Sequence, residues 1–276
     1  MRSEYGAVSS ALVPLDILPV LAHLCIDPTE LEQSWVTSKR RMVASLTATG
    51  ASSDRQLSDK LAACQDAPDR RCNLPCCPKC VGYMRKSLIY DMTAYAGQLV
   101  NRKRIAMSWL TYDLPGWRFR PGELAELDLR QLNSMFYERY AEAHFPFVVS
   151  TVTLRAIQNR RSARNWYWQI QVSSLFIGTR PASIANYLER SCHQQNPCRR
   201  ETRSTIDEVL FCAIEPEIFR EPNDRSEACL SLLPDQLREV TRWFSRYDMA
   251  DRCVFNGCRW TARRIILGPE LPSRSN

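Results

Sequence analysis

The sequence predicts an α+β fold, with an antiparallel sheet that carries helices packed on one face and a cysteine-rich loop before it. From residue 104 onward, strand-like and helix-like segments follow in the order strand, helix, strand, strand, helix, strand, helix. Two of the strand-like segments flank a short polar turn, as in a β-hairpin. Four cysteines lie close together between positions 64 and 80, immediately before these segments.

The N-terminal part of the chain has weaker signals. A helix is expected over 27–38, where Pro28 suits a position in the first turn. Residues 47–58 are small and polar, which favours a linker or loop. A helix over 81–98 places apolar side chains on one side at helical spacing.

The segments that build the sheet are clearer. Residues 104–112 favour a strand, and the two Pro-Gly pairs within 113–122 favour a turn. The apolar stripe of the helix predicted over 124–144 consists of Leu129, Leu132, Phe136 and Tyr140. The β-branched run 147–154 and the aromatic run 166–177 are expected to pair. Further on, the patterns predict a helix over 182–191, a strand over 209–214 and a helix over 233–247.

These elements suggest four regions. Residues 1–60 are interpreted as an N-terminal extension and 61–100 as a metal-binding loop with its helix. The α+β domain spans 101–268, and a disordered tail covers 269–276.

Composition excludes some classes of protein. The apolar fraction of 45% and charged fraction of 24% are ordinary for a soluble globular chain. No apolar run reaches the roughly 18–20 residues that span a bilayer. The apolar segment 11–25 is interrupted by Pro14, Asp16 and Pro19 and has no basic leader, so no signal peptide is expected. Twelve cysteines in such a chain favour a reducing cytoplasm.

The cysteine segment predicts a structural zinc site. Cys64, Cys72, Cys77 and Cys80 supply four soft ligands, and the Cys77-Pro-Lys-Cys80 turn delivers two of them to one ion. Cys76 is an alternative ligand or a bystander, because adjacent residues rarely share one ion. The competing interpretation is a group of buried thiols or a disulfide pair.

The net charge of +7 supports nucleic-acid binding only weakly, but the basic residues are clustered. Some clusters lie within or just beyond the cysteine segment, and another lies in the turn of the predicted hairpin. The residues expected to contact DNA are Arg70, Arg71, Arg85, Lys86, Arg160, Arg161 and Arg164. The alternative is that these charges are simply solvated on unrelated faces.

The run from Cys64 through Arg71-Cys72 to Cys77-Pro78-Lys79-Cys80 resembles the zinc motif of rolling-circle plasmid replication initiators. In that family the motif precedes a nuclease domain with a similar order of elements, so the resemblance covers roughly residues 60–265. It implies a replication-initiator nuclease-like fold, DNA as partner (single-stranded or hairpin), and a bacterial cytoplasmic protein of a plasmid or mobile element.

The chain departs from the family where the chemistry lies. The family's two metal-binding histidines, one residue apart on a strand, correspond to Gln169 and Gln171, so the resemblance implies a degenerate metal site. At the place of its nucleophilic tyrosine stands Cys212, with Glu215 where a lysine is usual. Tyr187 and Tyr247 are the other tyrosine candidates, although each fits a helix core better.

The expected function is therefore a DNA-binding pseudoenzyme that lacks nicking activity and acts as an accessory or regulatory factor. One alternative is a metal-dependent nickase with an unusual Gln-x-Gln site that forms a tyrosyl-DNA intermediate. Another is a zinc-stabilised protein-interaction module.

Two further patterns remain open in the sequence. A second zinc site is conceivable from Cys192, His193, Cys198, Cys253 and Cys258, although small hydrophobic thiols are the simpler interpretation. One face of the strand 166–177, carrying either its tryptophans or Tyr167, is a possible platform for stacking unpaired bases.

Overall fold

The computed structural model describes residues 28–103, 107–158, 165–179, 181–192, 199–201, 220–222, 231–260 and 265–267. The described helices are α2 (Pro28–Thr47), α3 (Ser52–Ala62), α4 (Pro78–Lys103), α5 (Leu129–Glu142), α6 (Pro181–Cys192) and α8 (Pro234–Phe244), with the short 3-10 helices η1 (Pro68–Arg70), η2 (Glu123–Glu126) and η3 (Met249–Arg252). The strands are β1 (Met107–Phe119), β2 (Phe147–Gln158), β3 (Trp166–Ile177), β4 (Arg199–Glu201), β5 (Arg220–Pro222), β6 (Cys253–Asn256), β7 (Cys258–Trp260) and β8 (Ile265–Leu267).

Within the described residues, the main sheet has six strands and is open and mostly antiparallel. Its order is β4-β1-β3-β2-β5, and β6 pairs with another part of β2. The predicted hairpin is confirmed, because β2 and β3 pair antiparallel from Phe147 opposite Ile177 to Gln158 opposite Trp166. Among the described strands, only β5 runs parallel to its neighbour, β2. The predicted α+β class with an antiparallel sheet is thus correct in its coarse form.

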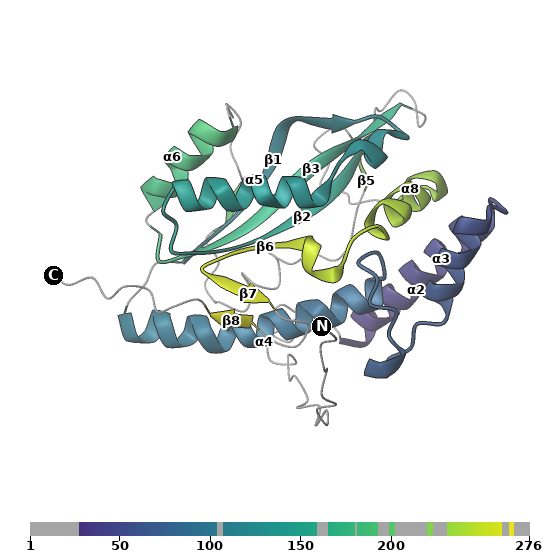
Figure 1. Ribbon diagram of the computed structural model, residues 1–276, viewed down its shortest axis with the longest axis horizontal. Helices are drawn as coiled ribbons and strands as arrows, with labels where there is room; N and C mark the ends of the chain where they lie inside the picture. The colour runs from purple at the N-terminus through teal and green to yellow at the C-terminus, as the bar shows by residue number, and fades with distance from the viewer. Residues whose placement is uncertain are drawn as a thin grey trace, which may run out of the picture.

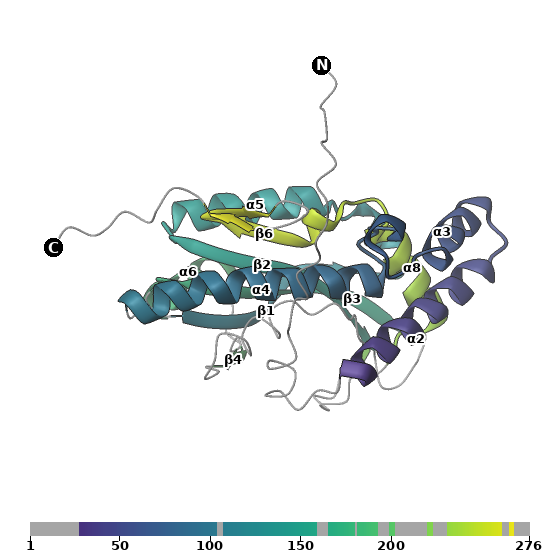
Figure 2. The same ribbon diagram turned by 90° about the horizontal axis from the view of Figure 1, so that it is seen from below.

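Helices lie on both sides of this sheet (Figure 1). Helices α5 and α6 cover one face, and α4 runs along the other, as the view from below also shows (Figure 2). The helices predicted over 124–144 and 182–191 thus share one face, whereas α4, which the sequence assigned to the preceding region, covers the other. The long helix begins at Pro78 and runs to Lys103, so it extends beyond both ends of the predicted helix 81–98.

The core lies between α5 and the sheet. The predicted stripe of α5 is buried: Leu129, Leu132, Phe136 and Tyr140 all have no exposed surface. Within this apolar layer, the Tyr140 hydroxyl lies 2.8 Å from Ser150 Oγ on β2 and 3.2 Å from Ser174 Oγ on β3. A buried hydroxyl group costs free energy unless it is hydrogen-bonded, so this network fixes α5 in register with both strands.

The N-terminal helices pack on a helix from the other end of the chain. Residues 47–58 were expected to form a linker, but Ser52–Ala62 form α3, so that prediction is wrong. The reason is tertiary: the buried Asp54 carboxylate accepts hydrogen bonds from Arg242 on α8. Arg238 on α8 also donates to the Ser45 carbonyl at the end of α2, 3.0 Å away.

Strand β1 continues through the predicted turn. It runs to Phe119, and its pairing with β3 shifts between Asp113, opposite Gln171, and Arg118, opposite Gln169. Four residues of β1 therefore oppose a single residue of β3, which makes Leu114–Trp117 a bulge. The predicted strand 209–214 and the residues after Gly268 lie outside the described residues.

Candidate metal centre

Three neighbouring pieces of backbone position the four predicted cysteine ligands. Cys64 lies two residues after the end of α3, where its N–H donates to the Leu61 carbonyl. Cys72 lies in the extended segment after η1. Cys77 precedes Pro78, the first residue of α4, and Cys80 lies in that helix's first turn. Proline suits this position because its missing N–H would have no partner within the helix.

The four sulfur atoms come together in one group. All four Sγ atoms lie within 4.8 Å of one another. Cys64 Sγ is 3.5 Å from Cys80 Sγ and 3.7 Å from Cys77 Sγ, while Cys72 Sγ is 3.6 Å from Cys80 Sγ. These separations are far longer than a disulfide bond of about 2.05 Å, and the four cysteines are free thiols. The group is therefore able to hold one metal ion.

Without a metal, the surroundings of the group favour a thiolate at Cys72, whereas hydrogen bonds with Cys72 raise the pKa of Cys77 and Cys80. Cys64, Cys77 and Cys80 are buried, and Cys72 is partly exposed. Cys77 and Cys80 lie at the N-terminus of α4, where the helix dipole stabilises negative charge. Hydrogen bonds from the Cys77 and Cys80 thiols lower the pKa of Cys72 to about 4. The Cys72 N–H lies 3.5 Å from Cys64 Sγ, which it approaches as a donor.

Cys76 lies outside this group. It is buried, and burial raises the pKa of its thiol well above the usual range. Of the two interpretations left open by the sequence, the structure favours the bystander.

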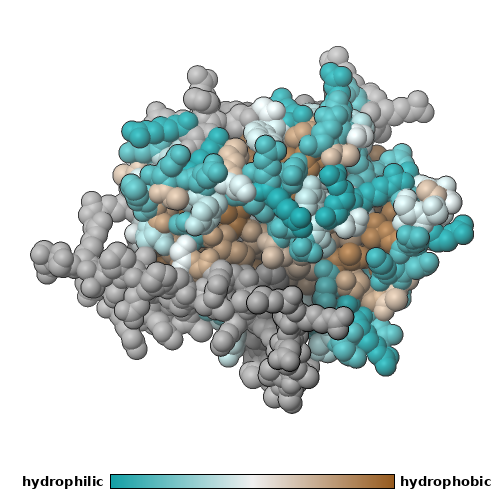
Figure 3. Space-filling view, in the orientation of Figure 1, coloured by the Kyte–Doolittle hydropathy of each residue, from teal (hydrophilic) through white to brown (hydrophobic). Residues whose placement is uncertain are grey.

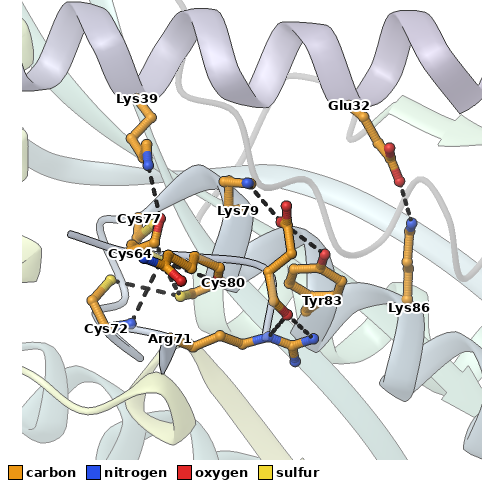
Figure 4. A network of polar contacts seen from close by, with 12 residues as sticks. Glu32, Lys39, Cys64, Arg71, Cys72, Cys77, Lys79, Cys80, Tyr83 and Lys86 are labelled. Atoms are coloured by element: carbon orange, nitrogen blue, oxygen red, sulfur yellow. Dashed lines mark hydrogen bonds and ion pairs between the residues drawn. The ribbon is translucent and has the colours of Figure 1, made fainter. Parts of the chain in front are cut away.

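Polar contacts within the loop hold its shape (Figure 4). The Asp66 carboxylate lies 2.6 Å from Lys79 Nζ and accepts a hydrogen bond of 3.0 Å from the Tyr83 hydroxyl. The hydrogen bond from Lys79 lowers the pKa of Asp66, whereas burial, together with Asp66, raises the pKa of Tyr83 to about 12. Arg71 stacks on the Tyr83 ring, with its guanidinium 3.6 Å from the ring centroid.

Two residues far away in the sequence also anchor the loop. Lys39 on α2 donates to the Cys64 carbonyl at 3.0 Å. Arg252, at the end of η3, is buried and donates to the Pro75 carbonyl at 2.9 Å. Sequence reasoning missed both residues, because nothing local distinguishes them from other basic residues.

The residues predicted to contact DNA differ in their exposure and pairing. Arg70 is exposed and Arg71 is half-buried beside the cysteine group. Lys86 pairs with Glu32 at 3.2 Å. Arg85 is only 3% exposed, so it does not lie on a surface that a phosphate could reach, and its assignment to the DNA-binding set is wrong. Arg160, Arg161 and Arg164 lie outside the described residues.

The two glutamines at the place of the family's histidines lie on the central strand β3. Gln169 is 4% exposed, and its amide nitrogen donates to the Leu114 carbonyl in the β1 bulge at 2.8 Å. Its amide oxygen accepts from Arg118 Nε at 3.2 Å. Gln171 lies on the same face and is partly exposed. Both the nitrogen and the oxygen of the Gln169 amide are thus hydrogen-bonded within the fold.

Both alternative tyrosines are core residues. Tyr187 is buried against the rings of Tyr140 and Phe145, with centroid separations of 5.7 and 5.2 Å. The buried Tyr247 hydroxyl donates to the Leu127 carbonyl at 2.9 Å. Neither phenol is exposed to a DNA strand. Cys212 and Glu215 lie outside the described residues.

The remaining candidates give no second site among the described residues. In that part of the chain, the four cysteines are the one group of side chains placed to share a metal ion. Cys253 is buried and Cys258 partly exposed, while His193 and Cys198 lie outside the described residues. Trp168 is fully buried and packs edge-on against Trp166, so this face of β3 is core rather than a stacking platform.

Comparison with known proteins gives no relative. No family model matches the chain, and neither a curated protein nor a solved structure does. Across the described residues, no helix has both the length and the apolar character needed to cross a membrane.

Proposed function

We propose that this chain is a zinc-stabilised DNA-binding protein with a replication-initiator-like fold and no nicking activity. It would act as an accessory or regulatory factor of a plasmid or mobile element. The observation that carries the proposal is the pairing of an intact four-cysteine group with a central strand whose Gln169 amide is already engaged within the fold.

Zinc is the metal that this donor set suits best. Four thiolates are soft ligands, and a tetrahedral zinc–sulfur bond of about 2.3 Å requires neighbouring sulfurs about 3.8 Å apart. Three of the six sulfur–sulfur separations, 3.5, 3.6 and 3.7 Å, are close to this value, and the other three are no more than 4.8 Å. Four protein ligands leave no open position for water or substrate, so the role of the ion is structural.

The lack of nicking rests on the residues that would perform it. A nickase of this type needs a cation bound beside the scissile phosphate and an accessible tyrosine. No two of the chain's three histidines are separated by a single residue, so the chain has no histidine pair of the kind that binds this cation. Gln169 is neutral, and its amide is already hydrogen-bonded. Tyr187 and Tyr247 are both buried.

DNA binding is supported by charge. The net charge is +7, and Arg70 and Arg71 lie beside a loop that the metal would make rigid. The face shown in Figure 3 is mostly hydrophilic over the described residues, with apolar areas between the polar ones, the larger of them in the lower half of the view.

The test is binding to labelled single-stranded and hairpin DNA across a salt series. Affinity should fall steeply with salt, because each phosphate contact releases counterions. Replacing Arg70 and Arg71 with alanine should weaken binding and reduce the salt slope by about 1 for each arginine that binds a phosphate. The exposed Arg55 on α3, replaced with alanine, is the matched control and should leave the slope unchanged. An affinity for DNA that does not change with salt concentration would contradict the proposal.

The same preparation tests the nickase alternative. Supercoiled and single-stranded DNA with Mn²⁺ should yield neither nicked product nor a covalent protein–DNA adduct. An adduct that disappears when Gln169 and Gln171 are replaced with alanine would establish the nickase instead.

One observation favours a protein-interaction module as second candidate. Lys79 and Lys86 are paired with Asp66 and Glu32, which lowers the positive charge around the loop. If no DNA binds even at low salt while zinc is present, this second function replaces the first.

A further inference from the structure

We propose that the cysteine group is also a switch that responds to hydroperoxides: oxidation at Cys72 closes a Cys72–Cys80 disulfide and releases the metal. This inference rests on the proposed zinc site and adds a mode of regulation to it.

The first argument is access. Cys72 is partly exposed, whereas the other three ligands are buried, with exposed fractions of 4% for Cys64, 0% for Cys77 and 4% for Cys80. A bound metal keeps its cysteine ligands deprotonated, and the thiolate is the form that attacks an oxidant. A peroxide in solution therefore meets the sulfur of Cys72 first.

The second argument is the position of the resolving thiol. Cys80 Sγ lies 3.6 Å from Cys72 Sγ, and the two cysteines come from separate pieces of backbone, the segment after η1 and the first turn of α4. Closing a disulfide requires the sulfurs to approach by about 1.5 Å. The segment before α4 can supply this movement, because Cys72 lies outside any helix or strand.

The chemistry balances with hydrogen peroxide as the only oxidant. The Cys72 thiolate attacks one peroxide oxygen, the O–O bond breaks, and a sulfenic acid and hydroxide form. The Cys80 thiolate then attacks the sulfenic sulfur, the S–S bond forms, and a second hydroxide leaves. Two thiolates are oxidised by two electrons in total, and one peroxide is reduced.

Loss of two ligands would disconnect the loop from its neighbours. With Cys72 and Cys80 joined to each other, only Cys64 and Cys77 remain for the metal, and two thiolates hold zinc far more weakly than four. Cys64 is the ligand that would link the end of α3 to α4 through the metal, and its carbonyl accepts a hydrogen bond from Lys39 on α2. Oxidation should therefore loosen the packing between these helices and the start of α4.

The experiment uses the full-length zinc-loaded protein and hydrogen peroxide. Zinc release is followed with a chromogenic chelator, sulfenic acids are trapped with a dione reagent, and disulfides are mapped by mass spectrometry. We expect about one zinc ion per chain to be released. The trapped sulfenic acid should be on Cys72, the first disulfide should be Cys72–Cys80, and a thiol reductant with added zinc should restore binding.

The matched control is a variant that leaves all four cysteines of the group in place. Cys76→Ser removes a buried thiol outside the group and should release zinc at the wild-type rate. Because a Cys72→Ser protein can fail to hold zinc at all, the position of the first adduct in the wild type decides the question. Zinc that stays bound in the presence of peroxide, or a first adduct on another cysteine, would overturn the switch but not the zinc site. A protein that contains no zinc when purified under reducing conditions overturns both the switch and the zinc site.

Discussion

Gln169 shows how a single polar side chain on a central strand can stabilise the fold itself. Its amide nitrogen donates a hydrogen bond to the Leu114 carbonyl within the β1 bulge, and its amide oxygen accepts a hydrogen bond from the Arg118 guanidinium. A carbonyl in a bulge loses its strand partner, and a buried unsatisfied carbonyl costs about 1–3 kcal/mol. This residue therefore stabilises the irregular pairing of β1 with β3.

Replacing Gln169 with alanine should lower the free energy of unfolding by about 1–3 kcal/mol, because the carbonyl of the buried Leu114 loses its hydrogen bond and the exposed Arg118 loses a partner. The neighbouring Gln171, on the same face but partly exposed, is the control, and its replacement should change stability by less than about 0.5 kcal/mol. Urea denaturation measures both. Equal effects at the two positions would show that the hydrogen bonds in the bulge contribute no stability.

Other residues show what the sequence can and cannot reveal. The four cysteine ligands could be chosen because they are close in sequence, and so their grouping follows from local spacing. Lys39 and Arg252 could not, because they reach the loop only through the packing of α2 and η3. Arg85 was assigned to the surface because arginines usually are, but the buried side of α4 includes it.

At the scale of elements, regular patterns were predicted well and polar helices were not. The bounds of β3, Trp166–Ile177, and its pairing with β2 follow from aromatic and β-branched residues around a polar turn. Helix α3 was missed because its sequence, SSDRQLSDKLA, has few apolar residues to mark a helical face. Its buried side contains Asp54 and Ser58, and only the partner helix α8 explains why Asp54 is there.

The Asp54–Arg242 pair should contribute stability that depends on pH. The hydrogen bond from Arg242 lowers the pKa of Asp54, so the folded state favours the charged carboxylate. This contribution is fully present above the unfolded-state pKa of about 3.9 and is lost as pH falls through the lower folded-state pKa. Asp54→Asn should cost about 1–3 kcal/mol at pH 7, since the Arg242 head is half exposed.

The measurement is urea denaturation of both proteins at pH 7 and near pH 3. The difference between wild type and Asp54→Asn should shrink at the lower pH. Asp59→Asn, at an exposed position of the same helix, should show no such difference. A gap between wild type and Asp54→Asn that stays constant with pH would mean that the pair does not link α3 to α8 through charge.

At the scale of the whole molecule, the cysteine loop joins parts that are distant in sequence. The loop lies between α3 and α4 and leads into α4, the helix that covers one face of the sheet (Figures 1 and 2). Its backbone carbonyls accept hydrogen bonds from Lys39 on α2 and from Arg252 in the segment before β6. A metal bound there would stabilise the packing of the N-terminal helices against the sheet. The predicted boundary at residue 60 falls inside α3, and α2 packs against α4 across it.

The most direct test of this account is the metal content of the reduced, purified protein, measured together with its thermal unfolding. The account predicts about one zinc ion per chain in the wild type and in Cys76→Ser, and none in Cys77→Ser. Structural zinc contributes on the order of 10 kcal/mol in peptides that fold around it, so Cys77→Ser and chelator-treated protein should lose the fold of at least the loop and the start of α4. Wild-type protein that contains no zinc, or that unfolds at the same temperature with and without a chelator, would contradict the account.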